Sequence, residues 1–170
     1  MNRCKDVGVR FHAEHRFSGP PDAVIGLLVD PEFHRELQLP DMSLPDVLDS
    51  NSEGDVTSLR LRYHYTGQLD PIATRLLGNR TLTWLQELRM DRSSGAGRLT
   101  FAAEADPKRL HGSADIVIEA VEGASRRLVD GELTVAVLAV GGMAARRIIP
   151  GLLRRLDIEA QVLDQRLRAG

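Results

Sequence analysis

Cysteine is almost absent from this chain of 170 residues, where Cys4 stands alone. A single cysteine excludes a disulfide within the chain and any cysteine-rich zinc site, and it is compatible with a reducing compartment. The first residues are polar and charged and lack the apolar stretch of a signal peptide. We therefore expect a cytoplasmic protein in which residues 1–7 form a flexible N-terminus.

The sequence also lacks a long apolar run and an excess of charge of one sign. Its longest nearly apolar run, 133–145, is too short for an integral membrane segment. Because this run contains Gly141 and Gly142, we interpret it as a buried strand that turns tightly into a helix. The formal net charge of -2 provides no positive field for nucleic acid. With 42% hydrophobic residues, the 170-residue chain is expected to form a single domain, 1–170, around one core.

Alternation of apolar and polar residues predicts an antiparallel sheet with one buried face. In the stretch 9–17 every second side chain, His15 included, falls on the apolar face. A segment of polar residues and Gly54, 49–55, is interpreted as a turn. An insertion at 69–78 is interpreted as a short helix at the rim of a site. Further strands with one apolar face are predicted at 57–65, 81–91, 98–105, 111–121 and 127–138.

Helical spacing of apolar residues predicts two short helices and one long helix. The short helices follow Gly19 directly and are separated at Asp30-Pro31, which resembles an N-cap followed by proline, so that the second spans about 31–39. The long helix covers about 142–168 and carries a narrow apolar stripe, with a kink expected at Pro150. Its arginine pairs, 146–147 and 154–155, are interpreted as a solvated face rather than as a site for an anionic headgroup.

This element order, one strand, two short helices, a run of antiparallel strands and a long helix, resembles the helix-grip fold of the START and polyketide-cyclase (SRPBCC) superfamily. The helix junction 30–33 (DPEF) contributes to the likeness, and the stretches 76–90 (LLGNRTLTWLQELRM) and 131–153 (GELTVAVLAVGGMAARRIIPGLL) look like a bacterial family of unknown function within it. The resemblance implies an α+β fold in which a curved antiparallel sheet wraps around the C-terminal helix. It also implies a cavity for a lipid, sterol or polyketide-like molecule, in relatives that are either carriers or enzymes such as cyclases and aromatases.

Candidate ligand-binding residues are those expected on the inner face of the sheet and on the helix stripe. Aromatic rings offer apolar area and, in Tyr and Trp, a polar tip that can orient a ligand, although the same residues could simply fill the core. A glutamine on the inner face is either an orienting group or the sign of a β-bulge. The candidates are Tyr63, Tyr65, Trp84, Gln86, Phe101, His15, Ile149 and Leu152.

No catalytic or metal-binding constellation is found in the sequence, and no cofactor is expected. His12 and His15 are three apart on a strand, so they face opposite sides and cannot share a metal, and Glu87 and Glu104 are expected to face outward.

Three functions remain open. The first is binding or carrying of an apolar small molecule, and the second is a cyclase-type or aromatase-type enzyme with an inward His or Tyr. The third is a protein-interaction module, a possible homodimer, with Ile158 and Val162 as an exposed apolar pair.

Overall fold

The computed structural model describes residues 8–69, 71, 74, 81–137 and 140–170. The expected flexible segment 1–7 and most of the expected rim helix 69–78 lie outside these residues. Within the described part of the chain, no helix is both long enough and apolar enough to cross a membrane.

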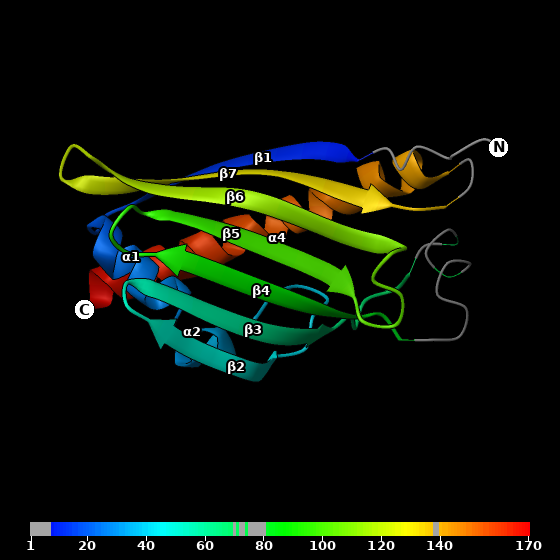
Figure 1. Ribbon diagram of the computed structural model, residues 1–170, viewed down its shortest axis with the longest axis horizontal. Helices are drawn as coiled ribbons and strands as arrows, with labels where there is room; N and C mark the ends of the chain where they lie inside the picture. The colour runs from blue at the N-terminus through cyan, green and yellow to red at the C-terminus, as the bar shows by residue number, and fades with distance from the viewer. Residues whose placement is uncertain (1–7, 70, 72–73, 75–80, 138–139) are drawn as a thin grey trace.

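Seven antiparallel strands form one sheet in the order β1-β7-β6-β5-β4-β3-β2, and the long helix α4 lies across one face of it (Figure 1). This is the helix-grip arrangement that the resemblance implies. The helices are α1 (Pro21–Leu28), α2 (Pro31–Glu36) and α4 (Gly141–Ala169). The strands are β1 (Val9–Phe17), β2 (Asp46–Glu53), β3 (Val56–His64), β4 (Thr83–Asp91), β5 (Ala96–Ala103), β6 (Leu110–Val121) and β7 (Ala124–Val135).

Strand β2 corrects one prediction, because most of the segment 49–55 interpreted as a turn belongs to this strand. Only Gly54, with φ 60°, and Asp55 form a turn. Nearly every residue of β2 is exposed, so the strand has no apolar alternation for a pattern to detect. Its structure comes from backbone pairing with β3 at the edge of the sheet, with one irregularity between Val47 and Asp49.

The two short helices begin as predicted. Pro21 occupies the first turn of α1, and the side chain of Asp30 accepts a hydrogen bond of 3.0 Å from the backbone N–H of Glu32 at the start of α2. Such a cap satisfies one of the backbone donors that the first turn leaves free. Helix α2 ends at Glu36, earlier than the predicted boundary near residue 39.

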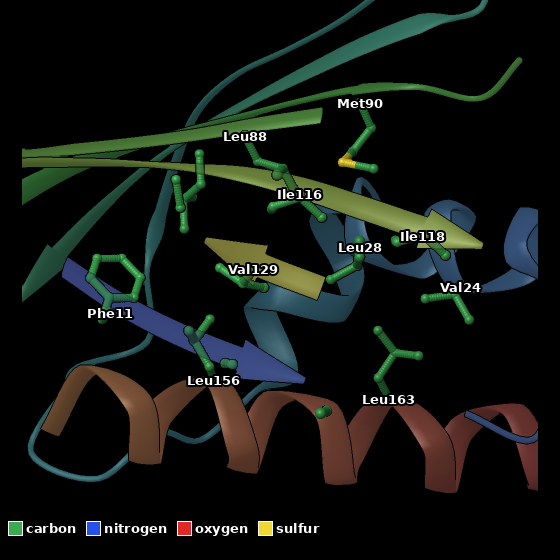
Figure 2. Packing of buried hydrophobic residues seen from close by; sticks show 14 of the residues in the cluster. Phe11, Val24, Leu28, Leu88, Met90, Ile116, Ile118, Val129, Leu156 and Leu163 are labelled. Atoms are coloured by element: carbon green, nitrogen blue, oxygen red, sulfur yellow. The ribbon is translucent and has the colours of Figure 1, made fainter. Parts of the chain in front are cut away.

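Helix α4 packs most closely on β1, β7 and α1 and remains helical through Pro150. Leu156 and Leu163 project from α4 toward the sheet, where they meet a large buried cluster that includes Phe11 and Val129 (Figure 2). Burial of side chains of this size stabilises the fold by about 1.5–3 kcal/mol each. Gly141 forms the tight corner expected before the helix, because a Cβ there would lie 2.1 Å from the carbonyl oxygen of Val135.

A second, smaller apolar cluster lies toward the β2 edge of the sheet, on β3 and the segment before β2. Its buried members are Met42, Leu59, Leu61 and Tyr63, and Trp84 packs against them. The sheet thus carries two separate apolar clusters, and the space between the second cluster and α4 is where a cavity opens.

Candidate ligand-binding cavity

A cavity of about 440 Å³ lies between the inner face of the sheet and the middle of α4. This volume falls within the range of about 300–1,000 Å³ that is typical of small-molecule sites. Apolar side chains make up most of its walls. Those of the sheet include Leu88, Leu99, Ala103, Leu133 and Val135, and those of the helix are Ile148, Leu152 and Leu156.

Six of the eight candidate residues line this cavity, and two do not. The six are Tyr63, Tyr65, Trp84, Gln86, Phe101 and Leu152, and their contact with a ligand stays a prediction. Ile149 packs against the main core instead, while its neighbour Ile148 faces the cavity. Consecutive helical residues differ by about 100° in direction, so a stripe read from the sequence does not decide between them. His15 does not line the cavity but is bonded to Arg127, which does.

Gln86 occupies the inner face of β4 without a β-bulge. The pairing of β4 with both β3 and β5 runs in unbroken register through Gln86, opposite Leu61 and Phe101. Among the described residues, the Gln86 side-chain amide has no hydrogen-bond partner. Its donor and acceptor are therefore available to a molecule in the cavity.

Tyr63 is 3% exposed and packs beside Trp84, with ring centroids 6.0 Å apart. Burial raises the pKa of the Tyr63 hydroxyl far above its usual range, and the negative charge of Glu159 raises this pKa further, against the opposing influence of Arg155. The hydroxyl therefore stays protonated and acts only as a donor or neutral acceptor. Within the described residues it has no hydrogen-bond partner.

Arg155 was missed, because the arginine pair 154–155 was interpreted as wholly solvated. Arg154 is exposed, but the guanidinium of Arg155 lies over the ring of Trp84, 4.5 Å from its centroid, and lines the cavity. Burial lowers the pKa of Arg155, against the opposing influence of nearby Tyr63 and Tyr65. Its spacing of three from Leu152 places it beside the apolar stripe, a signal that could have identified it.

The contacts of the Arg155 side chain are few. Its Nε donates to the carbonyl oxygen of Gly151 at 3.2 Å, and Nη1 approaches the sulfur of Met42 at 3.4 Å. No carboxylate of the described residues lies within 4.0 Å of its guanidinium.

Arg127, the other buried arginine of the site, is fully paired. Its side chain is 1% exposed, and it bonds to Glu159 at 2.5 Å and to the carbonyl oxygen of Leu156 at 3.2 Å. It also donates to Nδ1 of His15, whose Nε2 bonds to Asp157 at 2.8 Å. Burial and the charge of Arg127 lower the pKa of His15, although Asp157 and Glu159 oppose this shift. His15 is therefore a fully bonded member of a buried network.

Among the described residues, the other His and Glu candidates do not bond to one another, although His34 lines the cavity. His34 donates from Nε2 to the carbonyl oxygen of Leu28 at 2.7 Å, and its Nδ1 is enclosed without a partner among the described residues. Glu87 and Glu104 face outward, as predicted, toward Arg60 and Arg62. In the described part of the chain no three His, Cys, Asp or Glu side chains gather as metal ligands, and His12 and His15 lie on opposite faces of β1.

Comparison with solved structures places the fold among known helix-grip proteins. The chain is similar to TTHA0849 from Thermus thermophilus, with 17% identity, a TM-score of 0.66, and coverage of 95% of this chain and 98% of that one. It is also similar to Ara h 8.0201, with 12% identity, a TM-score of 0.65, and coverage of 96% and 100%. For the Zhui aromatase/cyclase from Streptomyces sp. R1128 the identity is 14%, the TM-score 0.65, and the coverage 96% and 98%.

At these identities the likeness establishes the fold and not an activity. No curated protein matches the sequence. One family model does match, and it covers nearly the whole chain, residues 12–167. The chain therefore belongs to the family described as protein of unknown function (DUF2505), and it has the helix-grip fold of the START and polyketide-cyclase superfamily.

Proposed function

We propose that this protein binds or carries an apolar small molecule in the cavity between its sheet and α4. The observation that supports this function is a cavity of about 440 Å³ whose walls are mostly apolar. A core formed only for stability would be close-packed, because each void forfeits contacts between the side chains around it. An apolar ligand restores those contacts and shields the cavity wall from water.

A cyclase-type or aromatase-type enzyme has less support from the site. Such chemistry needs a proton donor or acceptor placed beside open volume and oriented by a second group. His15 does not line the cavity, and Tyr63 and Tyr65 have no hydrogen bond to each other or to His15. The raised pKa of the Tyr63 hydroxyl makes it a weak proton donor, and its phenolate, the form that could accept a proton, is not populated near neutral pH.

A protein-interaction module has less support still. Ile158 and Val162 were predicted as an exposed apolar pair, but both are half-buried, and Val162 packs against the main core. The large apolar side chains that are exposed in the described chain come from three regions: Leu44 and Leu48 in or just before β2, Val117 on β6 and Met143 on α4. Isolated apolar residues on a surface are ordinary and do not define a docking patch.

Binding can be tested with the neutral fluorescent probe N-phenyl-1-naphthylamine, combined with native mass spectrometry of the purified protein. We expect saturable fluorescence enhancement and a co-purifying small molecule. The variant Leu152→Trp places a larger side chain at the cavity wall and should weaken probe binding at least tenfold. Arg154→Trp adds the same ring at an exposed position of α4 and should leave it unchanged. Absence of probe binding together with an empty native protein would contradict the proposal.

A further inference from the structure

The charged side chains around the cavity are unequal in number and in pairing. Four arginines line it against two carboxylates, Asp106 and Glu159. Glu159 is engaged by Arg127 at 2.5 Å, and Asp106 by Arg109 at 3.5 Å. The wall of the cavity therefore has more positive than negative charge, and its carboxylates are already held by arginines other than Arg155.

Most donors of the Arg155 guanidinium are unused among the described residues. A guanidinium has five N–H groups. One bonds to the Gly151 carbonyl and one faces the weak acceptor sulfur of Met42, which leaves three without a partner among the described residues. The guanidinium lies over the ring of Trp84, which occupies one side of it and accepts no conventional hydrogen bond, so these N–H groups remain available to a ligand.

Asp41 is the carboxylate that acts on the charge of Arg155, and it lies beyond ion-pair distance. A half-buried cation with no carboxylate of the described residues in contact with it is costly, because burial removes water that would solvate its charge. The lowered pKa of Arg155 reflects that cost. An anion entering the cavity would remove it, and the protonated hydroxyl of the neighbouring Tyr63 could donate a further hydrogen bond to the same anion. The site is thus chemically incomplete as it stands.

We infer that the ligand is an amphipathic carboxylic acid, whose carboxylate binds the guanidinium edge of Arg155 while its apolar body fills the cavity. This inference rests on the proposed function and specifies its ligand. A planar carboxylate matches the two parallel N–H groups of an arginine fork. A single negative charge fits better than a doubly charged phosphate, because the charge of Glu159 already acts on Tyr63 beside the site.

The test uses displacement of N-phenyl-1-naphthylamine by matched pairs of acid and alcohol, dodecanoate against dodecanol and 2-naphthoate against 2-naphthalenemethanol. A charge-assisted hydrogen bond contributes about 1.5–3 kcal/mol, so at pH 7.5 at least one acid should bind about 10–100-fold more tightly than its alcohol. Arg155→Gln should abolish this preference and leave binding of the alcohol within about twofold. Arg154→Gln removes the same charge one residue away, at an exposed position, and should keep the full preference.

The conservative variant Arg155→Lys keeps the charge but loses the planar fork, so it should retain only part of the preference. Thermal unfolding of each variant distinguishes a ligand-binding role from a structural one. If Arg155→Gln melts at a lower temperature and acid and alcohol both bind more weakly by the same factor, Arg155 acts structurally and the inference is wrong. If acids and alcohols bind wild type equally while the probe binds, the inference fails and the proposed function stands. If the probe does not bind and native mass spectrometry finds the protein empty, both are overturned.

Discussion

Two parts of α4 lie under the same sheet and carry the same apolar stripe, but they have different surroundings. From Leu156 to Leu163 the stripe is buried against β1 and β7, in the packed region seen in Figure 2. From Arg147 to Glu159 the helix borders the cavity, and in the part before Leu156 the apolar side chains Ile148 and Leu152 are only half-buried. The difference shows that one amphipathic helix can close a core at one end and form the wall of a binding site at the other.

Truncating one leucine in each region should give the largest difference. Leu163→Ala removes a fully buried side chain and leaves a void, so we expect the free energy of unfolding to fall by about 2–5 kcal/mol. Leu152→Ala only enlarges an existing cavity and should cost less than about 1 kcal/mol. Urea-induced unfolding of both variants measures this contrast. Equal losses would mean that the two regions are packed alike.

The buried network around Arg127 should be more sensitive than its exposed edge. Glu159→Gln leaves the Arg127 cation without its carboxylate, and we expect a loss of about 1.5–3 kcal/mol in the free energy of unfolding. Asp157→Asn changes a carboxylate that is 68% exposed and should cost at most about 1 kcal/mol. Denaturant titrations at pH 7.5 compare the two. A larger loss for Asp157→Asn would place the important contact at the surface.

Two glycines of α4 provide a further contrast. Gly151→Ala adds a methyl group where nothing lies within 4 Å and removes backbone freedom from the unfolded chain, so it should stabilise by about 0.5–1 kcal/mol. Gly141→Ala directs its methyl group onto the carbonyl oxygen of Val135 and should destabilise by about 1–3 kcal/mol. Thermal melts with opposite shifts are expected. A lower melting temperature for Gly151→Ala would show that the cavity wall at this point is closed.

The smallest expected effect is the pH dependence contributed by His15. Its pKa is lowered in the folded protein, chiefly by burial and by Arg127, so the unfolded chain takes up a proton at a higher pH than the folded protein does. As the pH falls below about 6.5, the free energy of unfolding should therefore decrease. At pH 8 both states are neutral at this residue and the penalty is absent. Urea titrations between pH 8 and pH 5 should show a shallower decrease for His15→Gln, and an unchanged slope would contradict the assignment.

Much of the fold could be predicted where one face of an element is buried. The spacing of apolar residues in β1 and α4 follows from burial of one face, and the Asp30 cap is a hydrogen bond between neighbours in the sequence. Both kinds of signal can be detected in the order of the residues. Strand β2 could not be predicted, because its residues are exposed on both faces and show no apolar alternation. Its extended conformation comes from backbone pairing with β3. The part of the candidate site that the sheet contributes was predicted for a related reason. Side chains alternate between the two faces along a strand, and this alternation places Tyr63, Trp84 and Gln86 on the inner face.

The sequence by itself determined which side chains face inward, because periods of two and of 3.6 residues follow from backbone geometry. Only the tertiary structure decided what the inward side chains meet. Whether an inward residue is in the core or at a cavity depends on how far the opposing wall lies, and that distance is set by the path of α4 over the sheet. The same path removes Arg155 from water and places it on Trp84, and it pairs Arg127 with Glu159, contacts between residues far apart in the chain that no local pattern encodes.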